Sequence, residues 1–364
     1  MTTTNESSSF QTHPAIGADT RLWTDHDHRR EVALENREGF TDLICDRFPL
    51  VPRNYIAYYL EHLVVEHHIE NPLIERYLEA ELGVVAKYRE FIRDLAAGGL
   101  SVVGQSCLDI GCSNGALLLA CLGEGASSAM GIDISSARLQ GAALLCSESE
   151  ARLACIDIVT EPLAETFDVI FCTDVLEHVE NAETALRKIA SALHDDAKAF
   201  AYVTVFNRNA MQNVLEEPHF SVPGLIRLAA KDGQRIWNAV RSAFHGQLEY
   251  GVYDWHDYSE YVEMAERYGL TVKHFYSEDT ILTSCAVEMA QYEENATRFE
   301  REFAERRLDL PLPDADLQLL DSAAAEYLQE FRRDHASRKG EDLEATRRLF
   351  FKYYAQPLAF VLSH

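Results

Sequence analysis

The stretch that decides the fold of this chain reads Leu108-Asp109-Ile110-Gly111-Cys112-Ser113-Asn114-Gly115. A strand-like apolar run leads into it, and a helical pattern over 116–122 follows it. Small residues at Gly111, Ser113 and Gly115 let the backbone turn tightly out of a strand and into a helix. The free N–H groups of that helix then face a ligand, and Asp133, at the end of the next apolar run, can bind ribose hydroxyls. The stretch therefore predicts the floor of a nucleotide-type cofactor site.

Two other kinds of site use a turn of this shape. A dinucleotide dehydrogenase needs G-x-G-x-x-G, but Ser113 and Ala116 stand at the second and third glycine positions, which favours a ligand without a pyrophosphate. A hydrolase nucleophile elbow reads G-x-S-x-G, and residues 111–115 match it literally. An elbow normally follows several strands, whereas only one strand is expected before Gly111. The hydrolase is therefore the minor alternative.

The composition indicates a protein that can bury a sizeable core and that carries a strong negative charge. The chain has 364 residues, of which 47% are apolar, so one α/β domain with helical additions is expected. Its 33 Lys and Arg against 59 Asp and Glu give a net charge of −26, which would repel a phosphate backbone. We therefore expect no nucleic-acid partner.

The eight cysteines and the lack of a membrane signal indicate where the protein works. Most of the cysteines fall in the apolar runs of the middle of the chain and none forms a Cys-x-x-Cys pair, so a reduced, intracellular chain is expected. No apolar run approaches the ~20 residues of a membrane span, and residues 1–9 do not resemble a leader. The sequence thus predicts a cytoplasmic protein with no membrane partner.

The middle of the chain alternates strand and helix patterns, as a doubly wound sheet requires. The expected strands are 106–110, 129–132, 152–156, 167–172, 199–205, 271–276 and 357–362, and the helices between them are 116–122, 137–146, 182–193 and 258–268. The predicted fold class is α/β, with a doubly wound, mostly parallel, seven-stranded Rossmann-like sheet. An N-terminal helical lid precedes the sheet, and a helical insertion precedes its last strand.

The same patterns predict how the chain is divided. Residues 1–100 form an arm and a helical lid, whose helices break near Asn71-Pro72 and end at Gly98-Gly99. Residues 101–285 and 355–364 form the core, in which 206–257 covers the substrate. Residues 286–354 form the helical insertion, for which a separate C-terminal helical domain is the alternative. Its charged helices could mediate a homodimer or be solvated surface.

Four carboxylates follow successive strands. Asp109, Asp133, Asp157 and Asp174 close the first, second, third and fourth strands, so they are expected at the carboxyl edge of one sheet. A hydride cofactor has no use for four carboxylates. A ligand with a ribose, an adenine amino group and a cationic amino-acid tail does.

With this set of motifs the chain resembles the class I S-adenosylmethionine-dependent methyltransferases, with Ser113 in place of the middle glycine of their first motif. The resemblance covers about 107–276 and the terminal strand. It implies S-adenosylmethionine as cofactor and S-adenosylhomocysteine as product, with Asp133 at the ribose, Asp157 at the adenine and Asp174 at the methionine end. The cofactor-binding residues it implies are Asp109, Gly111, Cys112, Ser113, Gly115, Asp133, Ile134, Asp157, Ile158 and Asp174.

The segment Asp174-Val175-Leu176-Glu177-His178 resembles the one that follows the fourth strand in the ubiquinone-pathway type of methyltransferase. It supplies two catalytic candidates, His178 as a base with an ordinary pKa near 6.5 and Glu177 beside it. His256 is the third, although its aromatic neighbours could equally form a hydrophobic staple. The predicted substrate-contacting residues are His219, Tyr253 and Trp255.

The sequence thus predicts methyl transfer to a small-molecule acceptor, with an oxygen as the favoured accepting atom and a histidine as base. Transfer to carbon or nitrogen, or a cyclase or regulatory protein that binds the cofactor without transferring its methyl group, are the alternatives. Asp174, Glu177, His178 and His256 also resemble a divalent-metal set of the superfamily. Because the first carboxylate is Asp and the remote histidine is offset, no metal is predicted.

Overall fold

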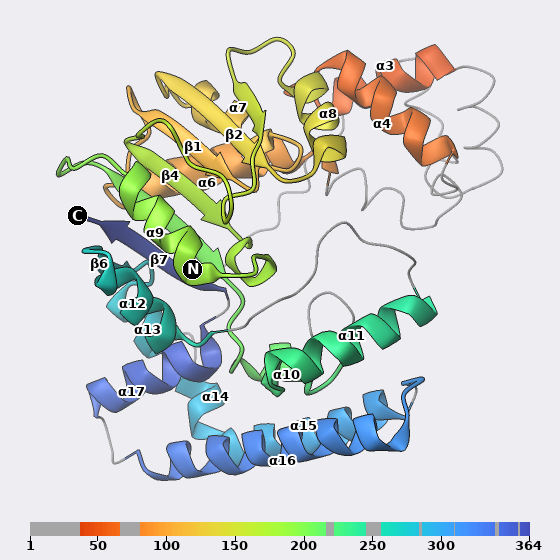
Figure 1. Cartoon of the computed structure of the whole chain (residues 1–364), viewed down its shortest axis with the longest axis vertical. Coiled ribbons are helices and arrows are strands. Elements are labelled where there is room, and N and C mark those ends of the chain that lie inside the picture. The colour runs from red at the N-terminus through yellow and green to blue at the C-terminus, as the bar shows by residue number, and fades with distance from the viewer. Residues whose placement is uncertain are drawn as a thin grey trace, which may run out of the picture. The chain divides into compact units, whose positions relative to one another are not determined.

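The computed structural model describes residues 37–65, 81–215, 222–244, 256–283, 286–308, 310–338, 342–355 and 357–364. Its strands form one seven-stranded sheet in the order β3-β2-β1-β4-β5-β7-β6 (Figure 1), which confirms the predicted fold class. The chain divides into two compact units, Met1–Cys155 and Ile156–His364. The division into an N-terminal lid, core and insertion stays a prediction.

In the first unit three parallel strands carry the turn quoted above. They are β1 (Ser106–Ile110), β2 (Ser128–Asp133) and β3 (Arg152–Cys155), with β2 paired to both neighbours. Helices α7 (Ala116–Gly123) and α8 (Ser136–Leu145) follow β1 and β2. Four of the five β1 residues are buried, as a strand covered on both faces requires. The predicted bounds of β1 agree with the structure, and the others differ by one or two residues.

The N-terminal helices of this unit share a core with the helices after β1 and β2. They are α3 (Arg37–Arg47), α4 (Arg53–Val65) and α6 (Val84–Ala97). The shared core includes Ile44, Tyr55 and Ile56 from these helices and Ala116 and Leu145 from α7 and α8. The glycine pair at 98–99 ends α6 as predicted, because Gly98 caps it and Gly99 adopts φ 90°. The predicted break at Asn71-Pro72 lies outside the described residues.

In the second unit two parallel strands are followed by an antiparallel pair. β4 (Val169–Thr173) pairs with β5 (Phe200–Val205), and β7 (Leu358–Ser363) runs antiparallel between β5 and β6 (Thr271–His274). Helices α9 (Ala182–Ala192) and α12 (Tyr258–Arg267) precede β5 and β6. β4 begins two residues later than predicted because Phe167 forms an isolated bridge with Leu193 instead of extending the strand.

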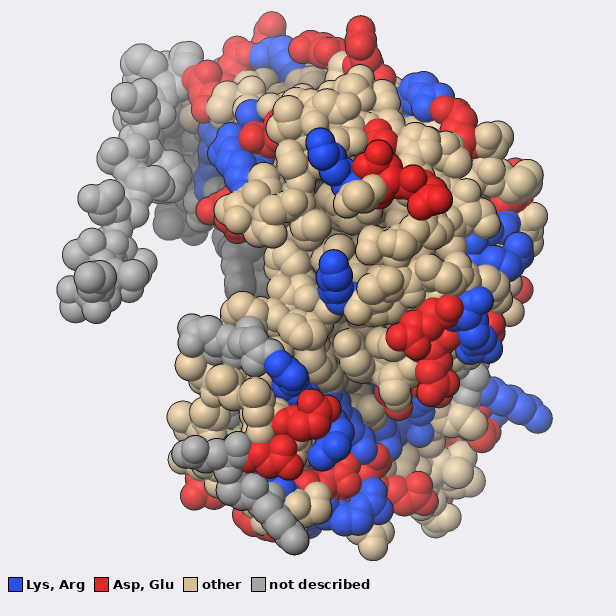
Figure 2. Space-filling model, turned by 90° about the vertical axis from the view of Figure 1, so that its left-hand side faces the viewer, with Lys and Arg blue, Asp and Glu red and all other residues tan. Residues whose placement is uncertain are grey.

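In the described part of the chain between β6 and β7 the structure has α13 (Glu278–Thr283), α14 (Ala286–Ala290), α15 (Tyr292–Arg307), α16 (Asp314–Ala336), α17 (Leu343–Leu349) and the π-helix η4 (Phe350–Tyr354). Helices α15 and α16 run side by side (Figure 1), and Phe299 packs on Tyr327 with ring centroids 5.3 Å apart. Acidic and basic side chains alternate on the face shown in Figure 2. Among the described residues, no helix is both long and apolar enough to cross a bilayer.

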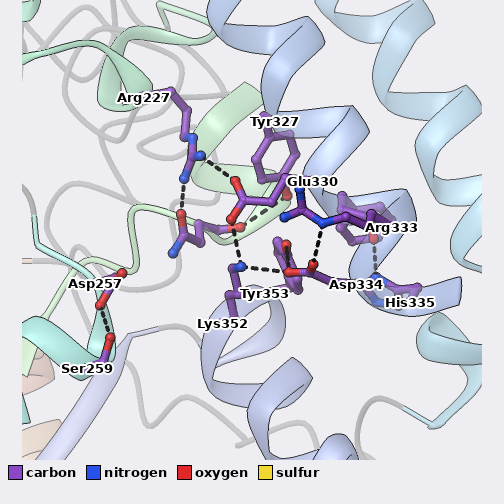
Figure 3. Close-up of polar contacts among 12 residues, drawn as sticks. Arg227, Asp257, Ser259, Tyr327, Glu330, Arg333, Asp334, His335, Lys352 and Tyr353 are labelled. Carbon is purple, nitrogen blue, oxygen red and sulfur yellow. Dashed lines mark hydrogen bonds and ion pairs between the residues drawn. The ribbon is translucent and has the colours of Figure 1, made fainter. Parts of the chain in front are cut away.

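The segment between β5 and α12 is helical where the structure describes it. It contains α10 (Met211–Leu215), η3 (Leu225–Arg227) and α11 (Ala230–Phe244). Arg227 donates to Glu330 of α16 at 2.8 Å, and Lys352 of η4 contacts both Glu330 and Asp334 at 2.6 Å (Figure 3). Each cation therefore has a carboxylate partner, and these ion pairs join the segment after β5 to the helices before β7.

Candidate functional site

The turn after β1 is held in a left-handed conformation. Gly111, Ser113 and Gly115 have φ of 74°, 48° and 80°. A Cβ on Gly115 would lie 2.9 Å from Cys146 Sγ, so any side chain there would be both strained and obstructed. The N–H groups of Gly111 and Cys112 donate to the carbonyl of Ile132 at 2.8 and 3.0 Å, which fixes the turn against β2. The turn around Ser113 is therefore fixed on β2 and has no side chain at two of its positions, Gly111 and Gly115.

Asp133 is the centre of the polar contacts at this turn. Its Oδ2 accepts the N–H of Ser113 at 2.9 Å, and its Oδ1 accepts the N–H of Ser135 at 2.8 Å. The carboxylate is buried, yet each of its oxygens has a further lone pair for a ligand hydroxyl. Ile134, the next residue, is 64% exposed, which is unusual for a large apolar side chain and suits contact with a flat ring.

Asp109 lies in β1 close to Asp133. Burial raises the pKa of Asp109 to about 8, and the charge of Asp133 acts in the same direction. The neighbouring Cys112 thiol packs against Gly131, where an added Cβ would meet Sγ at 2.7 Å. Burial also raises the pKa of the Cys112 thiol, so this cysteine remains protonated and contributes through its backbone rather than as a nucleophile.

In the second unit Asp157 organises the turn that follows β3. Its Oδ1 accepts the N–H of Val159 and its Oδ2 accepts the Thr160 hydroxyl, both at 2.8 Å. Although burial opposes ionisation, these hydrogen bonds hold the pKa of Asp157 below its ordinary value. Ile158 is buried beside it. Asp157 is thus an ionised carboxylate that follows a strand end.

Asp174 follows β4 in a strained conformation. Its φ is 54°, and its N–H and carboxylate bond to Thr204 of β5, the hydroxyl of which lies 3.0 Å from Oδ1. A non-glycine residue persists in the left-handed region only where its surroundings fix it. The chain then enters the short 3-10 helix η2 (Leu176–His178), in which His178 is half-buried. The turn therefore orients His178 directly after the strand end.

Glu177 is the most unusual residue of this turn. Its side chain is 1% exposed, and in the described part of the molecule neither carboxylate oxygen has a hydrogen-bond partner. Burial raises the pKa of Glu177 to about 8, with the charge of Asp174 acting in the same direction. A buried carboxyl group without a partner is costly to fold, which points to a functional role in place of a stabilising one.

We expect Glu177→Gln to stabilise the protein at pH 8 by about 2–4 kcal/mol, since one pKa unit corresponds to about 1.4 kcal/mol. The folded-state pKa is raised from 4.5, so the native state binds more protons than the unfolded state between pH 4.5 and 8. The stability of the native chain therefore falls as the pH rises through this window. Urea unfolding from pH 5 to 8 should show a higher free energy of unfolding for Glu177→Gln than for the native chain, and the difference should grow with pH.

The matched control is Glu180→Gln on the exposed surface nearby. It should show no gain that depends on pH. An equal gain for Glu177→Gln at pH 5 and pH 8 would contradict the buried, ionisable role of Glu177.

His256 lies where α12 begins. The next residue, Asp257, is the N-cap and forms a capping box with Glu260. His256 packs edge-on against Tyr261, with centroids 5.4 Å apart, and its Nδ1 lies 3.7 Å from Glu260. These are the contacts of a hydrophobic staple, the structural alternative that the sequence left open for His256.

The remaining predicted residues divide into those that the structure describes and those that it does not. His219, Tyr253 and Trp255 lie outside the described residues, so their contact with a substrate stays a prediction.

No group of three or more His, Cys, Asp and Glu in the described part of the chain is placed to hold a metal ion. Arg138, which was not among the predicted site residues, donates to Ser113 Oγ at 2.8 Å. No sequence motif marks that residue.

Comparison with known proteins gives the family. The model of the family described as methyltransferase domain matches residues 77–274, which is more than half of the chain. The ubiquinone biosynthesis O-methyltransferase of Idiomarina loihiensis is 33% identical over 110 residues, 29% of this chain and 44% of that protein. The human mitochondrial enzyme of the same name is 30% identical over 124 residues, 32% of this chain and 33% of that protein. The chain thus spans less than half the length of either relative.

A solved structure of an S-adenosylmethionine-dependent methyltransferase from Mesorhizobium loti shares 17% identity at a TM-score of 0.40, covering 50% of this chain and 81% of that one. The family match includes the turn after β1, the buried Asp133 and the strained turn at Asp174. The chain belongs to the methyltransferase domain family, which confirms its resemblance to the class I S-adenosylmethionine-dependent enzymes.

Proposed function

We propose that this protein transfers a methyl group from S-adenosylmethionine to an oxygen atom of a small-molecule acceptor. The observation that carries the proposal is the left-handed turn at Gly111 to Gly115, held on the buried carboxylate of Asp133 within the matched family region. The partial similarity to ubiquinone biosynthesis O-methyltransferases supports oxygen as the accepting atom.

The residues of the first unit fit such a cofactor. Gly115 allows the turn to pass close to Cys146, whose Sγ would lie 2.9 Å from a Cβ at that position. Asp133 keeps acceptor capacity for ribose hydroxyls, and Ile134 exposes an apolar side chain next to it. When bound, S-adenosylmethionine would supply a methyl group on a cationic sulfur: a lone pair of the acceptor would bond to the methyl carbon while the carbon–sulfur bond breaks, and S-adenosylhomocysteine would leave. An ionised carboxylate stabilises a cation of this kind, whereas the raised pKa of Asp109 keeps that group largely protonated near neutral pH.

His178 is the group that we assign to removing the acceptor proton. It ends the short helix η2 after the strained turn at Asp174 and is half-buried, whereas His256 is engaged in the staple with Tyr261. Glu177, the residue before His178, has a pKa raised to about 8. A pKa near the working pH suits a group that takes a proton from a weakly acidic hydroxyl. The chain's own contribution is thus to orient the acceptor and accept one proton.

The donor and the transfer are tested separately. Isothermal titration with S-adenosylhomocysteine should give saturable binding, and incubation with methyl-labelled S-adenosylmethionine and cell extract should label a small molecule. The position of the label, read by mass spectrometry, decides between oxygen, nitrogen and carbon. Binding without any labelled product would support a regulatory protein in place of a transferase.

The role of His178 is tested by His178→Asn. Loss of a general base lowers kcat by about a hundredfold or more, while the KM for S-adenosylmethionine stays unchanged. The matched control is His194→Asn, at the amino end of β4, where His194 bonds to Asp168 and Thr166. Unchanged kcat in His178→Asn would remove this histidine from the mechanism.

A further inference from the structure

The two loops that carry the first half of the proposed site are joined by a closed ring of four hydrogen bonds. Ser113 N–H donates to Asp133 Oδ2 at 2.9 Å, and Ser135 N–H donates to Asp133 Oδ1 at 2.8 Å. Arg138 N–H donates to Ser135 Oγ at 3.3 Å, and Arg138 Nη1 donates to Ser113 Oγ at 2.8 Å. The ring thus begins and ends at Ser113.

The four members of the ring come from two turns of the sheet. Ser113 belongs to the turn between β1 and α7, while Asp133, Ser135 and Arg138 belong to β2 and the first turn of α8. Ser135 is the N-cap of α8, so its hydroxyl accepts the Arg138 N–H while the Arg138 side chain reaches back to the other turn. Asp133 and Arg138 therefore each bond to both Ser113 and Ser135, Asp133 from the end of β2 and Arg138 from the first turn of α8.

The departure from glycine at position 113 explains why such a link is useful. Ser113 has a Cβ and adopts φ 48°, a conformation that costs a non-glycine residue about 1 kcal/mol or more. Its N–H is fixed on Asp133 and its hydroxyl on Arg138, so both ends of the residue are held. A glycine would adopt this φ without help and would offer no hydroxyl to hold.

We propose that Arg138 is a positioning residue for the cofactor site: by bonding to the Ser113 hydroxyl it holds the β1–α7 turn in its ligand-binding conformation. This inference rests on the proposed function, since the ligand of the turn is taken to be S-adenosylmethionine. Arg138 acts through Ser113, not through contact with the reacting atoms. Its effect therefore depends on the serine at position 113.

A double-mutant cycle tests this dependence. The Kd for S-adenosylhomocysteine is measured by isothermal titration for the native chain, Arg138→Met, Ser113→Gly and the double variant. We expect Arg138→Met to weaken binding about three- to tenfold, the range for losing one hydrogen bond. In the Ser113→Gly background the same change should have no further effect. Arg138→Lys, which keeps a donor, should restore part of the affinity.

The matched control is Arg93→Met on α6, since Arg93 is exposed and pairs with Glu124. It should leave the Kd unchanged. The proposal is overturned if Arg138→Met reduces the affinity for S-adenosylhomocysteine as much in the Ser113→Gly background as in the native chain. It is also overturned if Arg138→Met leaves the affinity of the native chain unchanged.

A second measurement needs no ligand. Hydrogen exchange of the amides in residues 111–116 should be faster in Arg138→Met than in the native chain, with the same melting temperature, and should be unchanged in Arg93→Met. If the native chain binds no S-adenosylhomocysteine, the proposed function fails, and the exchange rates alone decide whether Arg138 holds the turn. Equal exchange in all three proteins would show that it does not.

Discussion

Replacing Asp133 by alanine is expected to weaken the binding of S-adenosylhomocysteine by at least about a hundredfold and to lower the free energy of unfolding. The loss of hydrogen bonds to ligand hydroxyls accounts for about 1–3 kcal/mol of binding energy. In addition, the N–H groups of Ser113 and Ser135 lose their acceptors, so both loops lose the conformation that the ligand needs. Isothermal titration and urea unfolding measure the two effects.

The variant Asp133→Asn separates the effect on ligand binding from the effect on folding stability. The amide keeps one acceptor oxygen for one of the two N–H groups, and its NH2 group faces the other. The free energy of unfolding should therefore fall less than in Asp133→Ala, while the affinity for the ligand is still reduced. Removing the charge of Asp133 also lowers the pKa of Asp109, which that charge helps to raise. An affinity equal to that of the native chain in either variant would contradict the ribose role of Asp133.

Replacing Asn207 by leucine is expected to destabilise the second unit by about 3–6 kcal/mol, because three buried polar groups lose their partners. Asn207 is fully buried at the end of β5. Its Nδ2 donates to the carbonyls of Phe351 and Ala355 at 3.0 and 2.9 Å, and its Oδ1 accepts the N–H of Asn209 at 3.0 Å. These carbonyls lie at and just beyond the π-helix η4, which makes one amide responsible for the end of that helix.

Urea unfolding measures the destabilisation by Asn207→Leu. The matched control is Asn238→Leu on the exposed surface of α11, for which we expect the free energy of unfolding to change by less than about 0.5 kcal/mol. Asn207→Asp keeps the acceptor but loses the donor and adds a buried charge, so it should be at least as harmful as leucine. A loss below 1 kcal/mol for Asn207→Leu would contradict the role of Asn207 in holding η4.

The parts of the fold that the sequence predicted are those that local physics decides. The β1 strand and the Gly98-Gly99 helix end follow from apolar runs and from a φ that only glycine adopts easily. The helices α10 and α11 were missed within 206–257. α10 has only five residues, which is too short to show a repeat, whereas Ile236, Trp237 and Val240 of α11 do lie at helical spacing and could have indicated that helix. The late start of β4 depends on the bridge from Phe167 to Leu193, a contact that no local pattern reveals.

The candidate site was predictable to a similar degree. The motif located Gly111 to Gly115 and Asp133, since strand ends and turns are readable from residue type. It gave no sign that Asp133 also binds two backbone amides, or that Arg138 closes a ring with Ser113. Nor did the sequence reveal that Glu177 is buried without a partner. Such facts depend on how loops meet in space, which a single sequence does not encode locally.

The antiparallel pair at the edge of the sheet determines the order in which this protein can be completed during synthesis. Among the described residues β6 pairs with β7 alone, and residues 275–357 separate the two strands. A ribosome that has released β6 has therefore produced a strand with nothing to pair with until the whole helical stretch and β7 have followed. Contacts of such long sequence separation form slowly. The nascent chain thus carries an open hydrogen-bonding edge while residues 275–357 are being made.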